Sequence, residues 1–256
     1  MVAKSLDAVR RVIDEMHHHL DQELTIDDMA RTAMFSKFHF TRVFSEVTGT
    51  SPRRFLSALR LQRAKFLLLS TDLNVADISS QVGYSSVGTF SSRFKICVGV
   101  SPSRFRELGG DVPELGAGPA DACDAPDRVA LRGRLVLPGD RPLGPVFVGL
   151  FPSSIPQGLP ARFLELDGPG PFELRDVPQG NWYVLAHSVP HGTVAGWAGG
   201  GHGTRDGLSI GRHGPVTVRA GVLPLPVDIV LRPADPWDPP VLLAVPTGAA
   251  GRVAAA

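Results

Sequence analysis

One predicted helical face, between residues 36 and 47, carries side chains that can recognise nucleic-acid bases. Phe40, Phe44 and Val47 fall at helical spacing and predict an apolar stripe that points inward. The opposite face presents, in order, Phe38, Thr41, Arg42 and Ser45. An arginine guanidinium can pair bidentately with guanine O6 and N7, and a threonine hydroxyl can bond a base edge or a phosphate. Arg42 is therefore the best candidate base reader, with Thr41 beside it.

Two neighbours of this face allow less specific chemistry. Phe38 either touches a thymine methyl group or packs on the next helix, and the sequence leaves both open. Lys37 flanks the face and is placed for a phosphate or water contact.

The segment with this face occurs twice in the chain. Gly49–Phe55 returns as Gly99–Phe105, and Phe40 and Phe44 return as Phe90 and Phe94. A repeat of this size indicates a duplicated supersecondary unit. Each copy predicts helix, tight turn and helix, which can bury one face and offer the other to a DNA groove.

The second copy carries weaker reading chemistry. Its outward positions are Gly88, Ser92, Lys95 and Ile96, with Thr89 at the edge of that face. Arg93 follows one residue later and is rotated by about 100° toward the flank, and Gly88 costs roughly 1 kcal/mol of helix stability relative to alanine. We therefore expect the first unit to supply most direct readout, and the second to contribute phosphate contacts and recognition of DNA shape.

Two helix starts combine free backbone N–H groups with cations. Ser51-Pro52-Arg53-Arg54 and Ser101-Pro102-Ser103-Arg104 each place proline at the first helical position, after a serine cap. Arg53, Arg54 and Arg104 are candidate phosphate contacts, although each taken singly could simply be solvated.

Periodicity and caps predict the helices that hold these residues. The expected helices are 6–20, 26–32, 36–47, 52–70, 75–82, 86–98 and a short one from residue 102. Thr25, Ser36, Ser51 and Asn74 are the expected N-caps, with Ser85 or Ser86 before the sixth helix. Gly49 and Gly99 are placed to end helices in the left-handed conformation.

The second copy resembles a known family signature. Its spaced residues resemble the signature of AraC-type transcriptional regulators. They are Gly83-Tyr84-Ser85-Ser86, Phe90-Ser91, Phe94-Lys95, Gly99-Val100-Ser101-Pro102 and Phe105-Arg106. Phe35–Phe44 resembles the upstream helix-turn-helix of that family. The resemblance covers about residues 6–108 and implies a seven-helix domain that places two helices in major grooves of double-stranded DNA. Ser92 stands where the family usually has arginine.

Composition divides the chain into two parts. Residues 1–108 hold 15 basic and 11 acidic side chains, whereas the remainder holds 11 and 14. Nearly all of the 28 glycines and 23 prolines lie in the second part, which favours turns. We expect an all-α domain at 1–108, a linker at 109–127, a β-sandwich at 128–233 and a flexible tail at 234–256.

About seven short runs predict an antiparallel β-sandwich in the second part. They are 129–137, 146–151, 161–166, 172–174, 182–187, 216–219 and 227–231. Gly170-Pro171-Phe172-Glu173-Leu174 and Val177-Pro178-Gln179-Gly180-Asn181-Trp182-Tyr183 resemble a hairpin of transthyretin-like, carboxypeptidase-regulatory-like sandwiches. That resemblance implies a non-catalytic module for sensing or oligomerisation.

Histidines raise a different hypothesis. His187, His191, His202 and His213 fall in a glycine-rich segment that could hold a metal or small ligand, or be a solvated mobile loop. Consecutive His17, His18 and His19 point about 100° apart on a helix, so they cannot face one ion together. The two cysteines, Cys97 and Cys123, make neither a disulfide framework nor a zinc site.

The sequence thus predicts a DNA-binding transcription regulator, with no enzymatic activity, cofactor or metal. No apolar run approaches about 18 residues, so we expect no membrane span and a cytoplasmic location. RNA polymerase, a small-molecule effector and a second copy bound through the sandwich are the further partners considered. The alternative is a DNA-targeted enzyme, or a metal- or ligand-binding protein with its site in the Gly/His segment.

Overall fold

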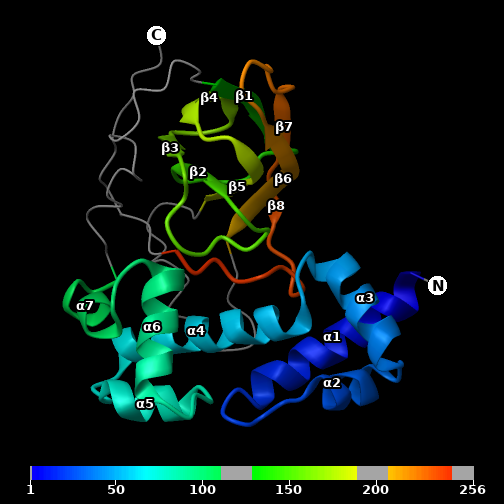
Figure 1. Ribbon diagram of the computed structural model, residues 1–256, viewed down its shortest axis with the longest axis vertical. Helices are drawn as coiled ribbons and strands as arrows, with labels where there is room; N and C mark the ends of the chain where they lie inside the picture. The colour runs from blue at the N-terminus through cyan, green and yellow to red at the C-terminus, as the bar shows by residue number, and fades with distance from the viewer. Residues whose placement is uncertain (1, 111–128, 189–206, 244–256) are drawn as a thin grey trace. The chain divides into compact units, whose positions relative to one another are not determined.

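The computed structural model describes residues 2–110, 129–188 and 207–243. The described chain forms two compact units. A helical unit contains the residues up to Gly110 together with 235–242. A β unit contains the strands between 129 and 234 and also Leu243. Figure 1 shows the helices and strands with the labels used below.

Seven helices make up the described part of the helical unit, as predicted. They are α1 (Val2–His18), α2 (Ile26–Ala33), α3 (Lys37–Thr48), α4 (Pro52–Ser70), α5 (Val75–Gln81), α6 (Val87–Val98) and α7 (Pro102–Glu107). Helix α4 contacts α1 and α3 on one side and α5 and α7 on the other, and Figure 1 shows it as the rod that joins the two groups.

Local capping chemistry sets most of these helix ends. Thr25 and Asn74 accept hydrogen bonds from backbone N–H groups at the starts of α2 and α5. Gly49 and Gly99 end α3 and α6 at φ 75° and 105°, in the left-handed region. Ser51 is the N-cap of α4 and Pro52 follows it in the first turn, as predicted, but the Ser51 side chain makes no capping hydrogen bond.

Two aromatic trios form the cores of the repeated units. In the first trio, the ring centroid of Phe44 lies 5.5 Å from that of Phe40 and 5.4 Å from that of Phe55. In the second, Phe94 lies 5.7 Å from Phe90 and 5.6 Å from Phe105. All six rings are buried. Each trio therefore ties the second helix of its unit to the helix that follows it.

The β unit is rich in antiparallel pairs. Its strands are β1 (Val129–Val136), β2 (Val146–Phe151), β3 (Phe163–Leu166), β4 (Gly170–Val177), β5 (Gly180–Ser188), β6 (Ser209–Val218), β7 (Val227–Val230) and β8 (Arg232–Pro233). They form one sheet in the order β4-β1-β7 and another in the order β3-β2-β5-β6-β8. The expectation of purely antiparallel pairing is wrong at one place, because β1 pairs with β7 in parallel.

The two sheets share one apolar core. Side chains from both line it, among them Leu131 and Ile229 from the first sheet and Val148 and Val184 from the second. Another predicted boundary is wrong in this unit. Residues 209–215 belong to β6, and 209–213 of them pair with β5, although their glycines and His213 suggested a mobile loop.

Part of the expected tail is packed into the molecule. Trp237 packs on the core of α1–α4, and Leu242 is fully buried in the same unit. Leu243 lies in an apolar cluster of the β unit with Phe147 and Phe151. A flexible tail from 234 is therefore the wrong description of residues 235–243, while 244–256 lie outside the described residues.

Candidate nucleic-acid interface

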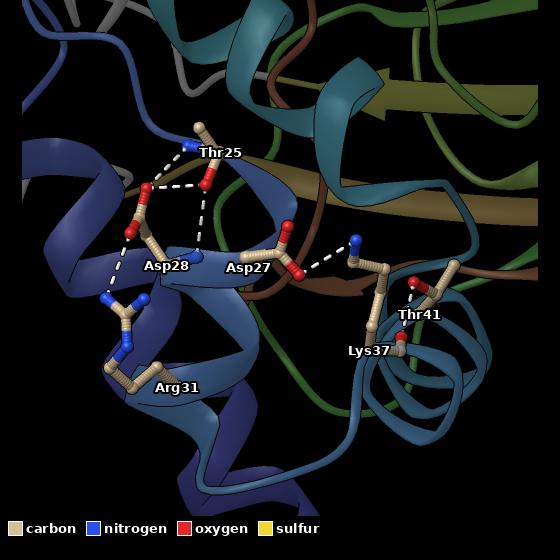
Figure 2. Close-up of polar contacts among 6 residues, drawn as sticks. All are labelled: Thr25, Asp27, Asp28, Arg31, Lys37 and Thr41. Atoms are coloured by element: carbon tan, nitrogen blue, oxygen red, sulfur yellow. Dashed lines mark hydrogen bonds and ion pairs between the residues drawn. The ribbon is translucent and has the colours of Figure 1, made fainter.

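Helix α2 has a firmly fixed start. Thr25 and Asp28 form a capping box, in which the Thr25 hydroxyl accepts the Asp28 N–H at 3.2 Å and the Asp28 carboxylate accepts the Thr25 N–H at 3.1 Å (Figure 2). The hydrogen bonds with Thr25 lower the pKa of Asp28, and a hydrogen bond from the Arg31 guanidinium lowers it further. The ionised Asp28 carboxylate thus caps the start of α2, the first helix of the first helix-turn-helix unit.

Helix α3 exposes the face predicted to read bases. The side chain of Phe38 is 90% exposed, so it does not pack on a neighbouring helix, which was one of the two readings left open. Arg42 is also exposed, whereas Thr41 and Ser45 are half-buried. The Thr41 hydroxyl donates to the Lys37 carbonyl oxygen at 2.8 Å, and its lone pairs stay available to a donor.

Acidic side chains lie against the cations of this face. Lys37 Nζ lies 2.8 Å from Asp27 Oδ1, a contact between α3 and α2 that Figure 2 shows. Arg42 Nη1 lies 4.0 Å from Glu46 Oε1. Both pairs are solvent-exposed and therefore weak. A phosphate or base can replace them, but it must compete with a carboxylate for Lys37.

The start of α4 combines three features of an anion site. Its serine does not occupy the first N–H groups, and Arg53 and Arg54 are both exposed. The helix dipole adds a partial positive charge at this end.

Helix α6 exposes a less charged face. Gly88, Thr89, Ser92 and Lys95 are exposed, as predicted from spacing. Ile96 beside them is 67% exposed. Lys95 is the one side chain of this set with a full charge.

Arg93 lies at the flank of α6 and is half-buried. Burial raises the pKa of Tyr84 and of Cys97, and the charge of Arg93 opposes this at both. Its guanidinium therefore acts on the interior of the second unit. At the start of α7, Arg104 is exposed and Nη1 lies 3.1 Å from Glu107 Oε2.

Sequence reasoning missed two cations on α4. Arg60 is half-buried and donates to two backbone carbonyls, those of Gly83 at 3.0 Å and Gln22 at 2.6 Å. Lys65 is 3% exposed, and burial lowers its pKa to about 7. Its Nζ donates to the Leu242 carbonyl at 3.0 Å. The signal for both was a charged residue that stands between two apolar residues in the sequence.

The Gly/His segment supplies no assembled site among the described residues. His187 is buried against the ring of Phe147, and His213 is exposed with Nδ1 3.3 Å from the Asp228 carbonyl. His191 and His202 lie outside the described residues. Within the described ranges no group of three or more metal-ligating side chains occurs. None of the described helices has the length and apolar character needed to cross a membrane.

Two helix-turn-helix units joined by one rod, each with an exposed second helix, define a double helix-turn-helix DNA-binding domain. A family model described as a helix-turn-helix domain matches residues 29–108. The Tn10 TetD protein of Escherichia coli is 34% identical over 98 residues, which are 38% of this chain and 71% of that protein. The chain belongs to the AraC-type helix-turn-helix family of DNA-binding transcription regulators.

Two further matches also cover less than half of this chain. The Msm operon regulatory protein of Streptococcus mutans is 31% identical over 39% of this chain, and the chain spans 36% of its length. A solved transcriptional regulator with an AraC-type DNA-binding domain, from Chromobacterium violaceum, is 28% identical. That match has a TM-score of 0.40 and covers 42% of this chain and 96% of that one.

Proposed function

We propose that the whole chain is a sequence-specific regulator that places α3 and α6 in adjacent major grooves of one DNA duplex. The observation that carries this is the exposed face of α3, where Arg42 and Phe38 stand free of the packed core. A helix that exposes an arginine opposite a buried aromatic stripe suits major-groove reading. Binding DNA inside the cell implies a cytoplasmic location.

The division of labour between the units follows from their charges. Arg42 reads bases, with Thr41 and Phe38 beside it, and Ser45 at the half-buried margin. The remaining cations contact phosphates: Lys37, Arg53, Arg54, Lys95 and Arg104. Arg93, at the flank of α6, is a further phosphate contact. Gly88, Thr89 and Ser92 let the backbone of α6 approach the groove closely, so the second half-site is recognised mainly by shape.

The β unit is the part whose role is least constrained by its residues. The shared core of its two sheets supports a transthyretin-like sandwich. Its function is sensing an effector, pairing with a second copy or recruiting RNA polymerase, with no enzymatic step.

Binding-site selection from random DNA, followed by footprinting of the full chain, tests the DNA-binding proposal. We expect two half-sites about 10–10.5 bp apart, the one under α3 being the more informative. Roughly six to eight phosphate contacts predict that log K falls with log salt at a slope near −5 to −7. Two equally informative half-sites would contradict the asymmetry, and a nearly flat salt response would contradict DNA binding itself.

A further inference from the structure

Arg60 connects parts of both helix-turn-helix units. It lies near the middle of α4. One guanidinium nitrogen donates to the carbonyl of Gln22, in the loop between α1 and α2. Another donates to the carbonyl of Gly83, in the turn between α5 and α6. We call these two hydrogen bonds the Arg60 bridge.

The two loops also meet at Gly83 itself. Its φ is +76°, which favours glycine. A Cβ there would overlap the Leu20 carbonyl oxygen and lie 2.8 Å from the guanidinium carbon of Arg60. The turn of the second unit is therefore seated against the loop of the first, with the arginine between them.

The turn held by Arg60 is continuous with the second reading helix. Tyr84 follows Gly83, and its hydroxyl lies 3.5 Å from Ser57 Oγ on α4. The Tyr84 ring packs 5.4 Å from Phe90 of α6. A shift of Gly83 would thus be passed to α6 through a buried aromatic contact.

The bridge requires a guanidinium. Its two carbonyl acceptors belong to different loops, and a planar fork with several N–H donors can serve both at once. A lysine ammonium has three donors but no planar fork, so it would not reproduce both bonds in the same geometry. Asp21 and Glu23, in the same loop as Gln22, add favourable charge around the arginine.

We propose that Arg60 is a positioning residue that fixes the spacing and rotation of α6 relative to α3, and so sets the half-site spacing that the protein accepts. Arg60 acts through Gln22 and Gly83 and needs no contact with DNA. The inference rests on the proposed binding of two half-sites by one chain. A rigid connection concentrates affinity at one spacing, because only that geometry allows both units to bind together.

The test measures affinity against spacing with the full chain. Probes carry the selected half-sites with one or two base pairs inserted or deleted between them, each step turning the groove by about 34–36°. Wild type should lose about tenfold in affinity for one inserted base pair, because the second half-site is then rotated and shifted out of register with α6. Arg60→Met should bind the best probe about tenfold more weakly and change by less than about threefold across the series.

Two further variants and one further probe make the result decisive. Arg60→Lys keeps the charge and should flatten the profile as well, so it serves if Arg60→Met does not fold by circular dichroism. Arg63→Met is the matched control: it removes an arginine from the same helix, where the guanidinium lies over the Phe66 ring, and should keep the wild-type profile. A probe with only the α3 half-site should bind all variants alike.

Each outcome has a defined meaning. A folded Arg60→Lys or Arg60→Met with the steep wild-type profile would overturn the role of Arg60 and leave the proposed function intact. A wild-type protein that binds DNA with no preferred spacing would overturn the two-groove function itself.

Discussion

The two helix-turn-helix units differ in what they expose far more than in what they bury. Their aromatic trios have nearly the same centroid distances, between 5.4 and 5.7 Å. Both second helices start at a capping serine and end at a left-handed glycine. Packing has therefore kept the duplicated scaffold constant, since even one methylene matters in a close-packed core.

The exposed positions have diverged. Each residue on the exposed face of α3 has a counterpart fifty positions later in α6. The pairs are Lys37 and Val87, Phe38 and Gly88, Arg42 and Ser92, Ser45 and Lys95, and Glu46 and Ile96. The first face has charge of both signs and an aromatic ring, and the second has little of either. One duplicated scaffold thus carries two exposed faces of different charge and shape.

The largest predicted effect tests the shared scaffold. Phe44→Ala and Phe94→Ala should each lower the free energy of unfolding of the helical unit by about 3–5 kcal/mol, since each removes the central ring of a trio. Urea denaturation followed by circular dichroism measures this. Phe38→Ala, on the exposed face, should change it by less than about 0.5 kcal/mol. Costs that differ by several kcal/mol between the two trios would mean that the scaffolds are not equivalent.

The next effect tests the divergence of the faces. Arg42→Ala should weaken binding to the selected site by about 5- to 150-fold and relax preference at one base pair. Ser92→Ala at the corresponding position should cost less than about threefold. Equilibrium binding at fixed salt measures both, with Arg219→Ala in the β unit as a control of equal charge change. Equal losses of affinity for Arg42→Ala and Ser92→Ala would show that the faces of α3 and α6 contribute equally to binding.

A buried lysine amino group distinguishes the second trio from the first. Lys65 Nζ lies 5.6 Å from the Phe105 ring, and burial lowers the pKa of Lys65 from 10.5 to about 7. Between these values the unfolded chain holds a proton that the folded protein has released, so Lys65 makes stability rise with pH. The slope is at most about 1.4 kcal/mol per pH unit.

Replacement of Lys65 by an apolar side chain isolates this effect. Lys65→Met should be more stable than wild type near pH 7, and its advantage should shrink as pH rises toward 9. Denaturation of both proteins across this pH range measures the difference in their free energies of unfolding. The contributions of the other titrating groups cancel in that difference, because both proteins contain them. A difference that does not change with pH would show that Lys65 keeps its ordinary pKa.

The smallest effect concerns a contact that only the first unit has. Asp27→Asn should release Lys37 and tighten DNA binding by about two- to fivefold at low salt. In the repeat, Ala76 takes the place of Asp27 and Val87 takes the place of Lys37. Ala76→Asp is therefore the reverse control and should weaken binding by a similar factor. Weaker binding by Asp27→Asn would mean that the ion pair positions Lys37 for DNA.

Local chemistry made much of the helical unit predictable. Thr25, Asn74, Gly49 and Gly99 act within one turn of their own positions, so the sequence alone located the helix ends. The exposed face of α3 followed from periodicity for the same reason. Long-range contacts were not predictable: Arg60 bonds carbonyls 23 and 38 positions away, and no spacing rule encodes that.

The β unit shows the same limit more strongly. Apolar runs such as 146–151 matched their strands, because buried strands have a clear composition. The start of β6 was missed, since Gly211 and His213 are poor strand formers that pairing with β5 holds in place. Pro236, Pro239 and Pro240 suggested a tail, although Trp237 and Leu242 are held by contacts with residues far away in the chain.

Residues 235–242 also have a consequence for biosynthesis. They complete the helical unit, yet about 125 residues separate them from Gly110. At roughly 5–20 residues per second, a ribosome needs several seconds or more to bridge that gap. Throughout this interval the nascent helices lack Trp237 on their core and Leu242 over Lys65. The regulator therefore acquires its finished helical unit only after the strands of the β unit have been synthesised.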